Sequence, residues 1–115
     1  MPNDRHSLLG ILDAIDAIEQ YTISFNSADE FYSKRVNFDA ALMNFIVIGE
    51  MVDRIAESFK VAHAEVDWKQ IKGLRNLIAH DYFGVDAEEL WDIVKNHLPR
   101  FKTSVLSVLN SLPSN

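Results

Sequence analysis

Residues 38–61, FDAALMNFIVIGEMVDRIAESFKV, contain the strongest helical pattern in this 115-residue chain. Apolar side chains recur there at intervals of three and four residues, a spacing that places them along one side of an α-helix. These residues are Leu42, Phe45, Ile46, Val52, Ile55 and Phe59. We therefore predict a long amphipathic helix over residues 38–61, with that side facing a hydrophobic core.

A second amphipathic helix is predicted on the N-terminal side of this segment, over residues 4–24. Its apolar stripe consists of Leu8, Ile11, Leu12, Ile15 and Ile18. Asn26 and Ser27 interrupt the pattern, and a short turn or helix at residues 29–33 leads into the long helix. The alternation typical of strands occurs nowhere over a useful length.

A third helix is predicted on the C-terminal side, from Trp68 to Phe83. Asp67 precedes it, and an aspartate at this position can accept a hydrogen bond from the free amide groups of the first turn. Gly84 follows Phe83 and is placed to end the helix, as glycines often do. The third helix therefore has a start signal and a stop signal in the sequence.

The last segment is expected to form a fourth helix that is divided near its middle. Asp86 and Glu89 form an approximate capping box for its start. Pro99 is expected to divide it, because proline lacks a backbone donor and clashes with the preceding turn. We therefore predict an all-α fold, in which residues 1–115 form one antiparallel bundle of four to five helices.

Composition narrows the class of protein. No apolar run approaches the roughly 18 residues of a membrane-spanning helix. Asp13, Asp16 and Glu19 lie within the apolar N-terminal stretch, which is not typical of a secretory signal. The chain has no cysteine, which excludes disulfides and thiolate ligands and fits a reducing compartment. We expect a cytoplasmic protein.

The charge is distributed unevenly along the chain. The net charge of -6 argues against binding to nucleic acid, which requires lysine and arginine to neutralise phosphates. Residues 1–67, however, contain twelve acidic and five basic side chains, whereas residues 68–115 contain five acidic and six basic ones. Between residues 68 and 82, Lys69, Lys72 and Arg75 are opposed only by Asp81. A local positive surface is therefore compatible with the acidic protein.

The predicted helix 68–83 has two different faces when each residue is rotated by about 100° from the last. One face is apolar and is expected to pack on the bundle core: Leu77, Leu74, Ile78 and Ile71. The opposite face mixes polar and apolar side chains: Arg75, Asn76, His80, Lys72, Ala79 and Phe83. A freely solvated face rarely has this composition, so a polar groove or a subunit interface is expected there.

Arg75 and His80 diverge by about 140° around this helix, so they need not touch within one chain. A second copy of the helix, packed across a two-fold axis, would bring Arg75 and His80 of both chains into one composite cleft. We therefore expect a homodimer.

The sequence resembles a known family in this region. HEPN domains share an Arg-x4-to-6-His motif, which in HepT toxins has the form Arg-x4-His-x-Tyr. Arg75, His80 and Tyr82 reproduce this form. Supporting positions are Ile48-Gly49-Glu50, Trp68, Ile71, Asn76 and the HDYFGVD sequence at residues 80–86. The resemblance extends over essentially the whole chain and implies a HEPN-like helical bundle.

The resemblance also implies a function. HepT-like proteins are toxins of toxin–antitoxin pairs, and a small nucleotidyltransferase of the MntA type is the antitoxin. The implied activity is metal-independent RNA cleavage by a homodimer, with Arg75 and His80 as catalytic residues and Asn76 in support. Tyr82 matches the tyrosine to which the antitoxin attaches adenylate groups. No metal site and no cofactor are expected.

Each of these residues also has a structural interpretation. Arg75 and His80 are compatible with exposed helix positions, Asn76 with a hydrogen bond to the backbone, and Tyr82 with packing. Trp68 and Gly49 are better explained as a core anchor and a close-packing site. Glu50, Asp53 and Glu57 form an acidic strip that is expected to be solvated, although Glu50 is placed to pair with a cationic site residue.

The sequence leaves one alternative function open. The same helical dimer would serve as a non-catalytic protein that binds a nucleotidyltransferase partner, or a nucleotide, through this groove. The retained Arg75, His80 and Tyr82 favour the ribonuclease, and the acidic balance favours the alternative. The chain lacks the Gly-Ser and Asp-x-Asp signature of a nucleotidyltransferase, so adenylating activity would belong to another protein.

Overall fold

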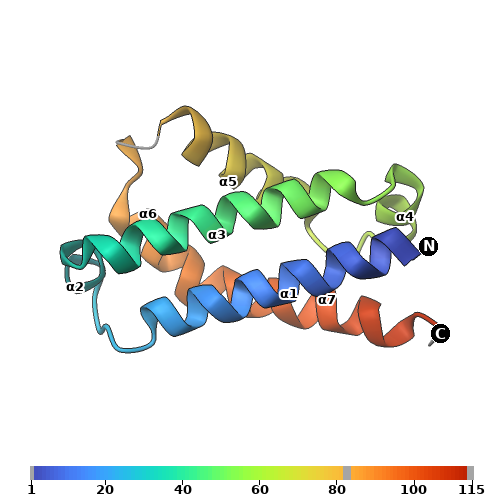
Figure 1. The fold of residues 1–115 in the computed structure, drawn as a ribbon, viewed down its shortest axis with the longest axis horizontal. Helices are drawn as coiled ribbons and strands as arrows, with labels where there is room; N and C mark the ends of the chain where they lie inside the picture. Colours follow the sequence, from blue (N-terminus) through green and yellow to red (C-terminus); the bar gives the residue numbers. More distant parts are fainter. Residues whose placement is uncertain (1, 82–83, 114–115) are drawn as a thin grey trace.

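The computed structural model describes residues 2–81 and 84–113, and throughout these ranges the fold is all-α (Figure 1). The elements are α1 (Pro2–Thr22), α2 (Ala28–Ser33), α3 (Arg35–Arg54), α4 (Glu57–Ala62), α5 (Trp68–His80), α6 (Ala87–Asp92), the π-helical η2 (Ile93–His97) and α7 (Leu98–Ser111). None of the helices in the described part of the chain is long and apolar enough to cross a membrane. The predicted fold class is confirmed.

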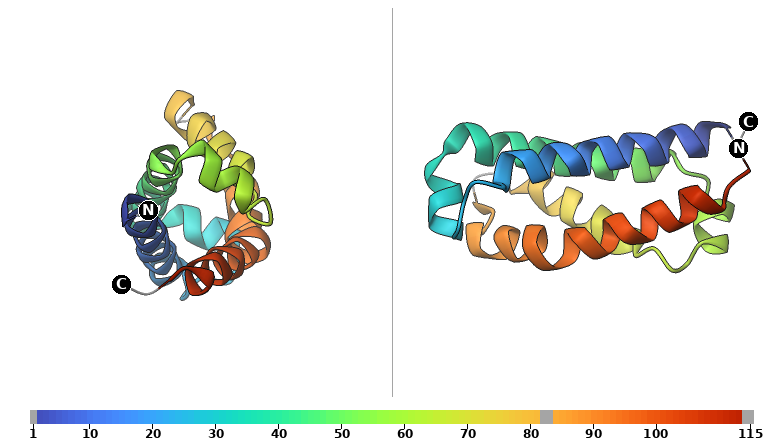
Figure 2. Two further views of the ribbon diagram at one scale, coloured as in Figure 1. Left: turned by 90° about the vertical axis from the view of Figure 1, so that its right-hand side faces the viewer. Right: turned by 90° about the horizontal axis from the view of Figure 1, so that it is seen from below.

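Helices α1, α3 and α7 form the body of the bundle (Figures 1 and 2). α1 runs antiparallel to α3 and to α7, and α5 packs on the outer side of α3. The predicted stripe of α3 faces the core: Leu42, Phe45 and Val52 are buried, and Ile46 is partly buried against them. The helical spacing in the sequence therefore identifies the core side of this helix.

The long helix ends earlier than predicted, at Arg54 rather than at Val61. Ile55 has an extended backbone, with φ -79° and ψ 135°. The next amide group, that of Ala56, donates a hydrogen bond of 3.1 Å to Oδ1 of Asp4 in α1. A buried carboxylate from another helix thus stabilises the break, and the chain turns into the short helix α4. The pattern within one helix does not reveal this distant partner.

Helix α5 also ends earlier than predicted, at His80 rather than at Phe83. Asp81 leaves the helical conformation, and its amide group donates to the carbonyl of Leu77 at 2.9 Å. Gly84 closes the turn with a 3.0 Å hydrogen bond from its amide group to the carbonyl of Asp81. A Cβ atom at Gly84 would collide with the carboxylate of Asp81, so the glycine provides space there. No described glycine has a positive φ.

The predicted division at Pro99 occurs as a change of helix type instead of a break. The five residues from Ile93 to His97 form a π-helical turn, and the amide group of Leu98 donates to the carbonyl of Ile93, five residues back. Pro99 lacks the donor that an α-helix would direct to the carbonyl of Lys95. The wider π-helical turn before the proline accommodates the missing hydrogen bond, and α7 continues to Ser111.

Candidate active site on helix α5

Helix α5 approaches α3 most closely where Arg75 lies over Gly49. Gly49 is buried, and a Cβ atom there would collide with Cβ and Cγ of Arg75. These two atoms lie next to the backbone and cannot move aside as the end of a flexible side chain can. The prediction that Gly49 is a close-packing site is therefore confirmed, and its partner is the arginine of the motif.

Arg75 is held by two carboxylates of α3. Nη1 donates to Oε1 of Glu50 at 3.1 Å, and Nη2 donates to Oδ2 of Asp53. The arginine side chain is only 18% exposed, although it carries a full charge. Its Nε is buried without a hydrogen-bond partner among the described residues. The chain therefore fixes the guanidinium by ion pairs on one side and by the backbone of α3 beneath it.

Glu50 pairs with a cationic site residue as predicted, but the role of Asp53 was missed. Asp53 binds both Arg75 and Lys72, whose Nζ lies 3.4 Å from Oδ1 of Asp53. The signal was present in the sequence, because Glu50 and Asp53 are three residues apart and therefore share one face of a helix. What the sequence did not show is that α5 packs against that face.

His80 and Asn76 have a different environment from Arg75. Both are exposed, and His80 is the last residue of α5. Neither side chain has a hydrogen bond or an ion pair to any residue in the ranges 2–81 and 84–113. The structure therefore does not bring Arg75 and His80 together within one chain. Tyr82 and Phe83 lie outside the described residues.

The apolar face of α5 is only partly buried, which corrects the prediction for Leu77. Ile71 and Ile78 are buried as expected, but Leu77 is 45% exposed and Leu74 is partly exposed. Both leucines line a hollow of about 240 Å³ between α5 and the segment α6 to α7. The reason is that α5 packs mainly on α3 and makes few contacts with the C-terminal helices.

The start of α5 is anchored as predicted. Asp67 caps the helix, with Oδ1 accepting a 3.1 Å hydrogen bond from the amide group of Gln70. Trp68 is 8% exposed, and its Nε1 donates to the carbonyl of His63 at 3.1 Å. A buried aromatic ring and a capped first turn thus fix the helix that carries the motif.

Comparison with known proteins identifies the family. Residues 11–108 match the family described as "Ribonuclease HepT-like". The chain belongs to this family. The resemblance to HepT-like HEPN proteins, seen first in Arg75 and His80, is thereby confirmed.

Several proteins are similar to this chain. A "Probable ribonuclease HepT" of Thermococcus cleftensis is 35% identical over 92 residues, which cover 80% of this chain and 83% of that protein. A "Gamma-glutamylcyclotransferase and putative RNase" of Methanocaldococcus jannaschii is 30% identical over 105 residues. That match covers 91% of this chain but only 47% of the relative, so the chain spans about half of that protein's length. No solved structure is significantly similar to the chain.

Proposed function

We propose that the chain is a metal-independent endoribonuclease and the toxin of a toxin–antitoxin pair, with residues 1–115 acting as one HEPN domain. The observation that carries the proposal is the arginine of the motif, held in place by Glu50 and Asp53, with a solvent-accessible histidine five residues later on the same helix. Relatives named as ribonucleases support the reaction class.

The proposed chemistry uses the 2'-hydroxyl of the RNA as the nucleophile. Its oxygen attacks the adjacent phosphorus while its proton leaves, and the bond from phosphorus to the 5'-oxygen breaks as that oxygen takes up a proton. An imidazole can both accept and donate a proton, so His80 suits these proton transfers. Arginine presents hydrogen-bond donors in a fixed geometry to phosphate oxygens, so Arg75 is suited to stabilise the negative charge that develops on these oxygens in the transition state. Asn76 supports them by orienting a phosphate or a base.

The proposed active unit is a two-fold homodimer with α5 at or beside the interface. Its support is that Arg75 and His80 lie on diverging sides of α5, while Leu77 remains 45% exposed on a third side. Sedimentation at micromolar concentration should give the mass of a dimer. A monomer alone at that concentration would contradict this part of the proposal.

Catalysis is tested by two substitutions and their matched controls. His80→Ala and Arg75→Ala should each abolish RNA cleavage, and cleavage by the unmodified chain should survive chelation of divalent metals. His6→Ala and Arg54→Ala are the controls, because both side chains are exposed and lie outside the motif. Unchanged cleavage by His80→Ala, or no cleavage of any cellular RNA by the unmodified chain, would refute the ribonuclease assignment.

Regulation is proposed to act through Tyr82, whose phenol oxygen would attack the α-phosphorus of ATP on a nucleotidyltransferase antitoxin. Pyrophosphate leaves, the phenol proton passes to solvent, and a bulky anionic adenylate remains beside the motif. This anion competes with an RNA phosphate for Arg75.

The test of this regulation is the intact mass of the protein after incubation with the cognate nucleotidyltransferase and ATP. The unmodified chain should gain adenylate and lose activity, whereas Tyr82→Phe should remain active and gain no mass. Tyr21→Phe and Tyr32→Phe are the controls, because both tyrosines are exposed. Modification at Tyr21 or Tyr32, or fully modified protein that still cleaves RNA, would remove Tyr82 from the mechanism.

A second candidate function is a non-catalytic dimer that binds its nucleotidyltransferase partner or a nucleotide. The observation in its favour is the pair Glu50 and Asp53, whose charges lie where an incoming phosphate would approach Arg75. The cleavage assay separates the two candidates, because a binding protein would associate with the antitoxin but leave RNA intact.

A further inference from the structure

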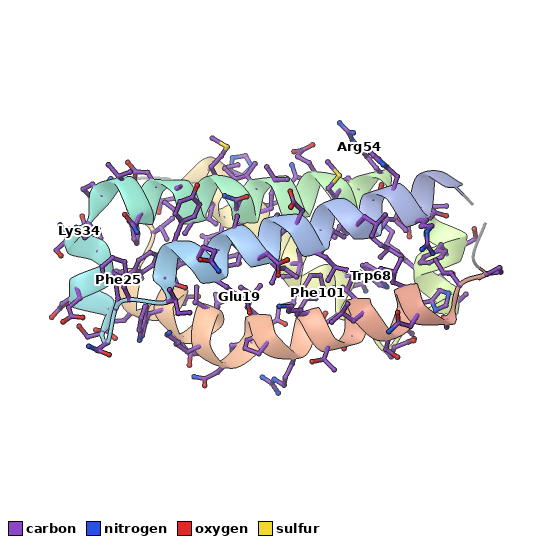
Figure 3. The ribbon with its side chains drawn as sticks, turned by 60° about the horizontal axis from the view of Figure 1, so that its bottom comes forward. Glu19, Phe25, Lys34, Arg54, Trp68 and Phe101 are labelled. Carbon is purple, nitrogen blue, oxygen red and sulfur yellow. The ribbon has the colours of Figure 1, made fainter. Side chains whose placement is uncertain are left out.

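A hollow of about 420 Å³ opens between the end of α3, the helix α4 and the first turns of α5, and Lys72 in its lining lies three residues before Arg75. Its lining residues are Val52, Glu57, Lys60, Val61, Trp68, Lys69 and Lys72. Figure 3 labels Trp68, which lies in the half of the molecule away from Lys34. The hollow is separate from the one lined by Leu74 and Leu77.

The hollow concentrates positive charge on an acidic protein. Three lysines line it against two carboxylates, that of Glu57 in the lining and that of Asp53 beside Lys72, which leaves one positive charge in excess, whereas the whole chain has a net charge of -6. Such a local excess attracts anions even when the overall charge is negative. The charge balance therefore favours a polyanion, or part of one, as the occupant.

The positive charge of the hollow is continuous with Arg75. One carboxylate, that of Asp53, bridges Lys72 and Arg75: its Oδ1 lies 3.4 Å from Nζ of Lys72, and its Oδ2 pairs with Nη2 of Arg75. The ammonium group and the guanidinium thus flank a single side chain. The cationic group of the hollow that is nearest to the motif arginine is therefore that of Lys72, one carboxylate away.

The three lysines have different freedom to bind a ligand. Lys60 is 11% exposed and is already engaged by Glu57 at 3.0 Å and by the carbonyl of Val52 at 3.3 Å, so it forms part of the wall. Lys72 is 52% exposed. The side chain of Lys69 is exposed and has no ion pair or hydrogen bond within the described part of the chain. Lys69 is therefore available to a phosphate, and Lys72, although it pairs with Asp53, is exposed enough to contact a phosphate as well.

We propose that this hollow binds the sugar–phosphate backbone of the RNA strand next to the cleaved bond. Lys69 and Lys72 bind flanking phosphates, while Arg75 binds the phosphate that reacts. Val61, which is 75% exposed, gives the rim an apolar surface for a ribose or a base. This inference rests on the proposed ribonuclease function and adds the location of the substrate outside the motif.

The test is the salt dependence of RNA binding, measured on the His80→Ala protein so that the RNA stays intact. A single-stranded oligonucleotide is titrated at several salt concentrations. Each lost phosphate contact should lower the slope of log K against log salt by about 0.7, which is roughly fivefold in affinity at ~0.1 M salt. Lys69→Gln should show this loss once, and the double variant Lys69→Gln with Lys72→Gln should show it twice.

Lys34→Gln is the matched control, because it removes the same charge from an exposed lysine at the other end of the molecule (Figure 3). Its slope and affinity should equal those of the parent protein. Suppose that the chain with His80 intact cleaves RNA, but that the Lys69 and Lys34 variants bind RNA equally well. This result would overturn the inference about the hollow and leave the proposed function unchanged. Loss of binding by the Lys69 variant, in a chain that does not cleave RNA, would support RNA binding in the hollow but refute the ribonuclease, and with it the placement of the hollow next to a cleaved bond. A chain that neither binds nor cleaves RNA would refute both.

Discussion

Arg75 and His80 lie five residues apart on one helix, yet their surroundings differ in kind. Arg75 lies over Gly49, pairs with two carboxylates and is 18% exposed. His80 is exposed at the helix end, without a partner among the residues that the structure describes. One side chain of the motif is thus positioned by its own chain, whereas no described residue of the chain holds the other.

This difference indicates which part of the site is positioned by the fold of one chain and which part is not. The position of Arg75 is encoded in α3, because Gly49 allows the close approach and Glu50 and Asp53 fix the charge. The position of His80 depends on the end of α5, where the helix stops at Asp81. We therefore expect substitutions in α3 to act through stability and Arg75 together, and substitutions near His80 to act on activity alone.

The largest combined effect is expected from Gly49→Ala. The added methyl group collides with Cβ and Cγ of Arg75, so α3 and α5 must move apart. Overpacking of this kind costs about 1–3 kcal/mol. Urea denaturation should show the loss of stability, and the cleavage assay should show a loss of activity because Arg75 shifts.

Gly73→Ala is the matched control for that substitution. Gly73 lies within α5, and a Cβ atom there would meet nothing within 4 Å. Replacing a glycine inside a helix by alanine stabilises it by about 0.5–1 kcal/mol. Equal stability changes for Gly49→Ala and Gly73→Ala would show that α5 does not press on α3 at Gly49.

A smaller effect is expected when the two carboxylates around Arg75 are neutralised separately. Asp53→Asn should cost more stability than Glu50→Gln, because Asp53 is 32% exposed and binds two cations, whereas Glu50 is 52% exposed and binds one. Exposed ion pairs contribute about 0.2–1 kcal/mol, so both losses should lie near that range. Urea denaturation of the two variants gives the order.

The kinetics of Asp53→Asn distinguish positioning from stability alone. Removing a negative charge beside the phosphate should lower KM, while a less firmly held Arg75 should lower kcat. A purely structural role would leave both constants unchanged in the folded fraction. Unchanged kcat together with unchanged KM would therefore remove Asp53 from the site.

The smallest effect on stability is expected from Asn76→Ala. Asn76 is exposed and has no partner in the described ranges, so the free energy of unfolding should change by no more than about 0.5 kcal/mol. Cleavage should fall, but less than in Arg75→Ala or His80→Ala. Unchanged cleavage would show that Asn76 has no part in orienting the substrate.

The sequence predicted those features that depend on local spacing. The stripe of α3, the cap at Asp67 and the anchor at Trp68 were all readable, because each depends on residues within a few positions of one another. The features that it did not predict depend on distant partners. The break after Arg54 requires Asp4, and the second ion pair of Arg75 requires α5 to pack on the face of α3 that carries Asp53.

The exposure of Leu77 illustrates the same limit. The helical wheel places Leu77 with Ile78 and Ile71, yet Ile78 is fully buried and Leu77 is 45% exposed. The helical wheel gives the direction of each side chain around one helix, but it does not show which neighbouring helices cover that side. The family motif filled part of this gap, because it singled out Arg75 and His80 without any knowledge of the packing.

In the proposed dimer, the motif becomes complete only when Arg75 of one chain meets His80 of a second copy. The most direct measurement is the RNA cleavage activity of a heterodimer between Arg75→Ala and His80→Ala chains, coexpressed with two different tags and purified through both. Such a dimer retains one intact arginine and histidine pair across the two-fold axis, so about half of the activity of the unmodified dimer should return. Each variant alone should be inactive. A heterodimer as inactive as its parents would contradict the claim and place both side chains of each working pair on the same chain.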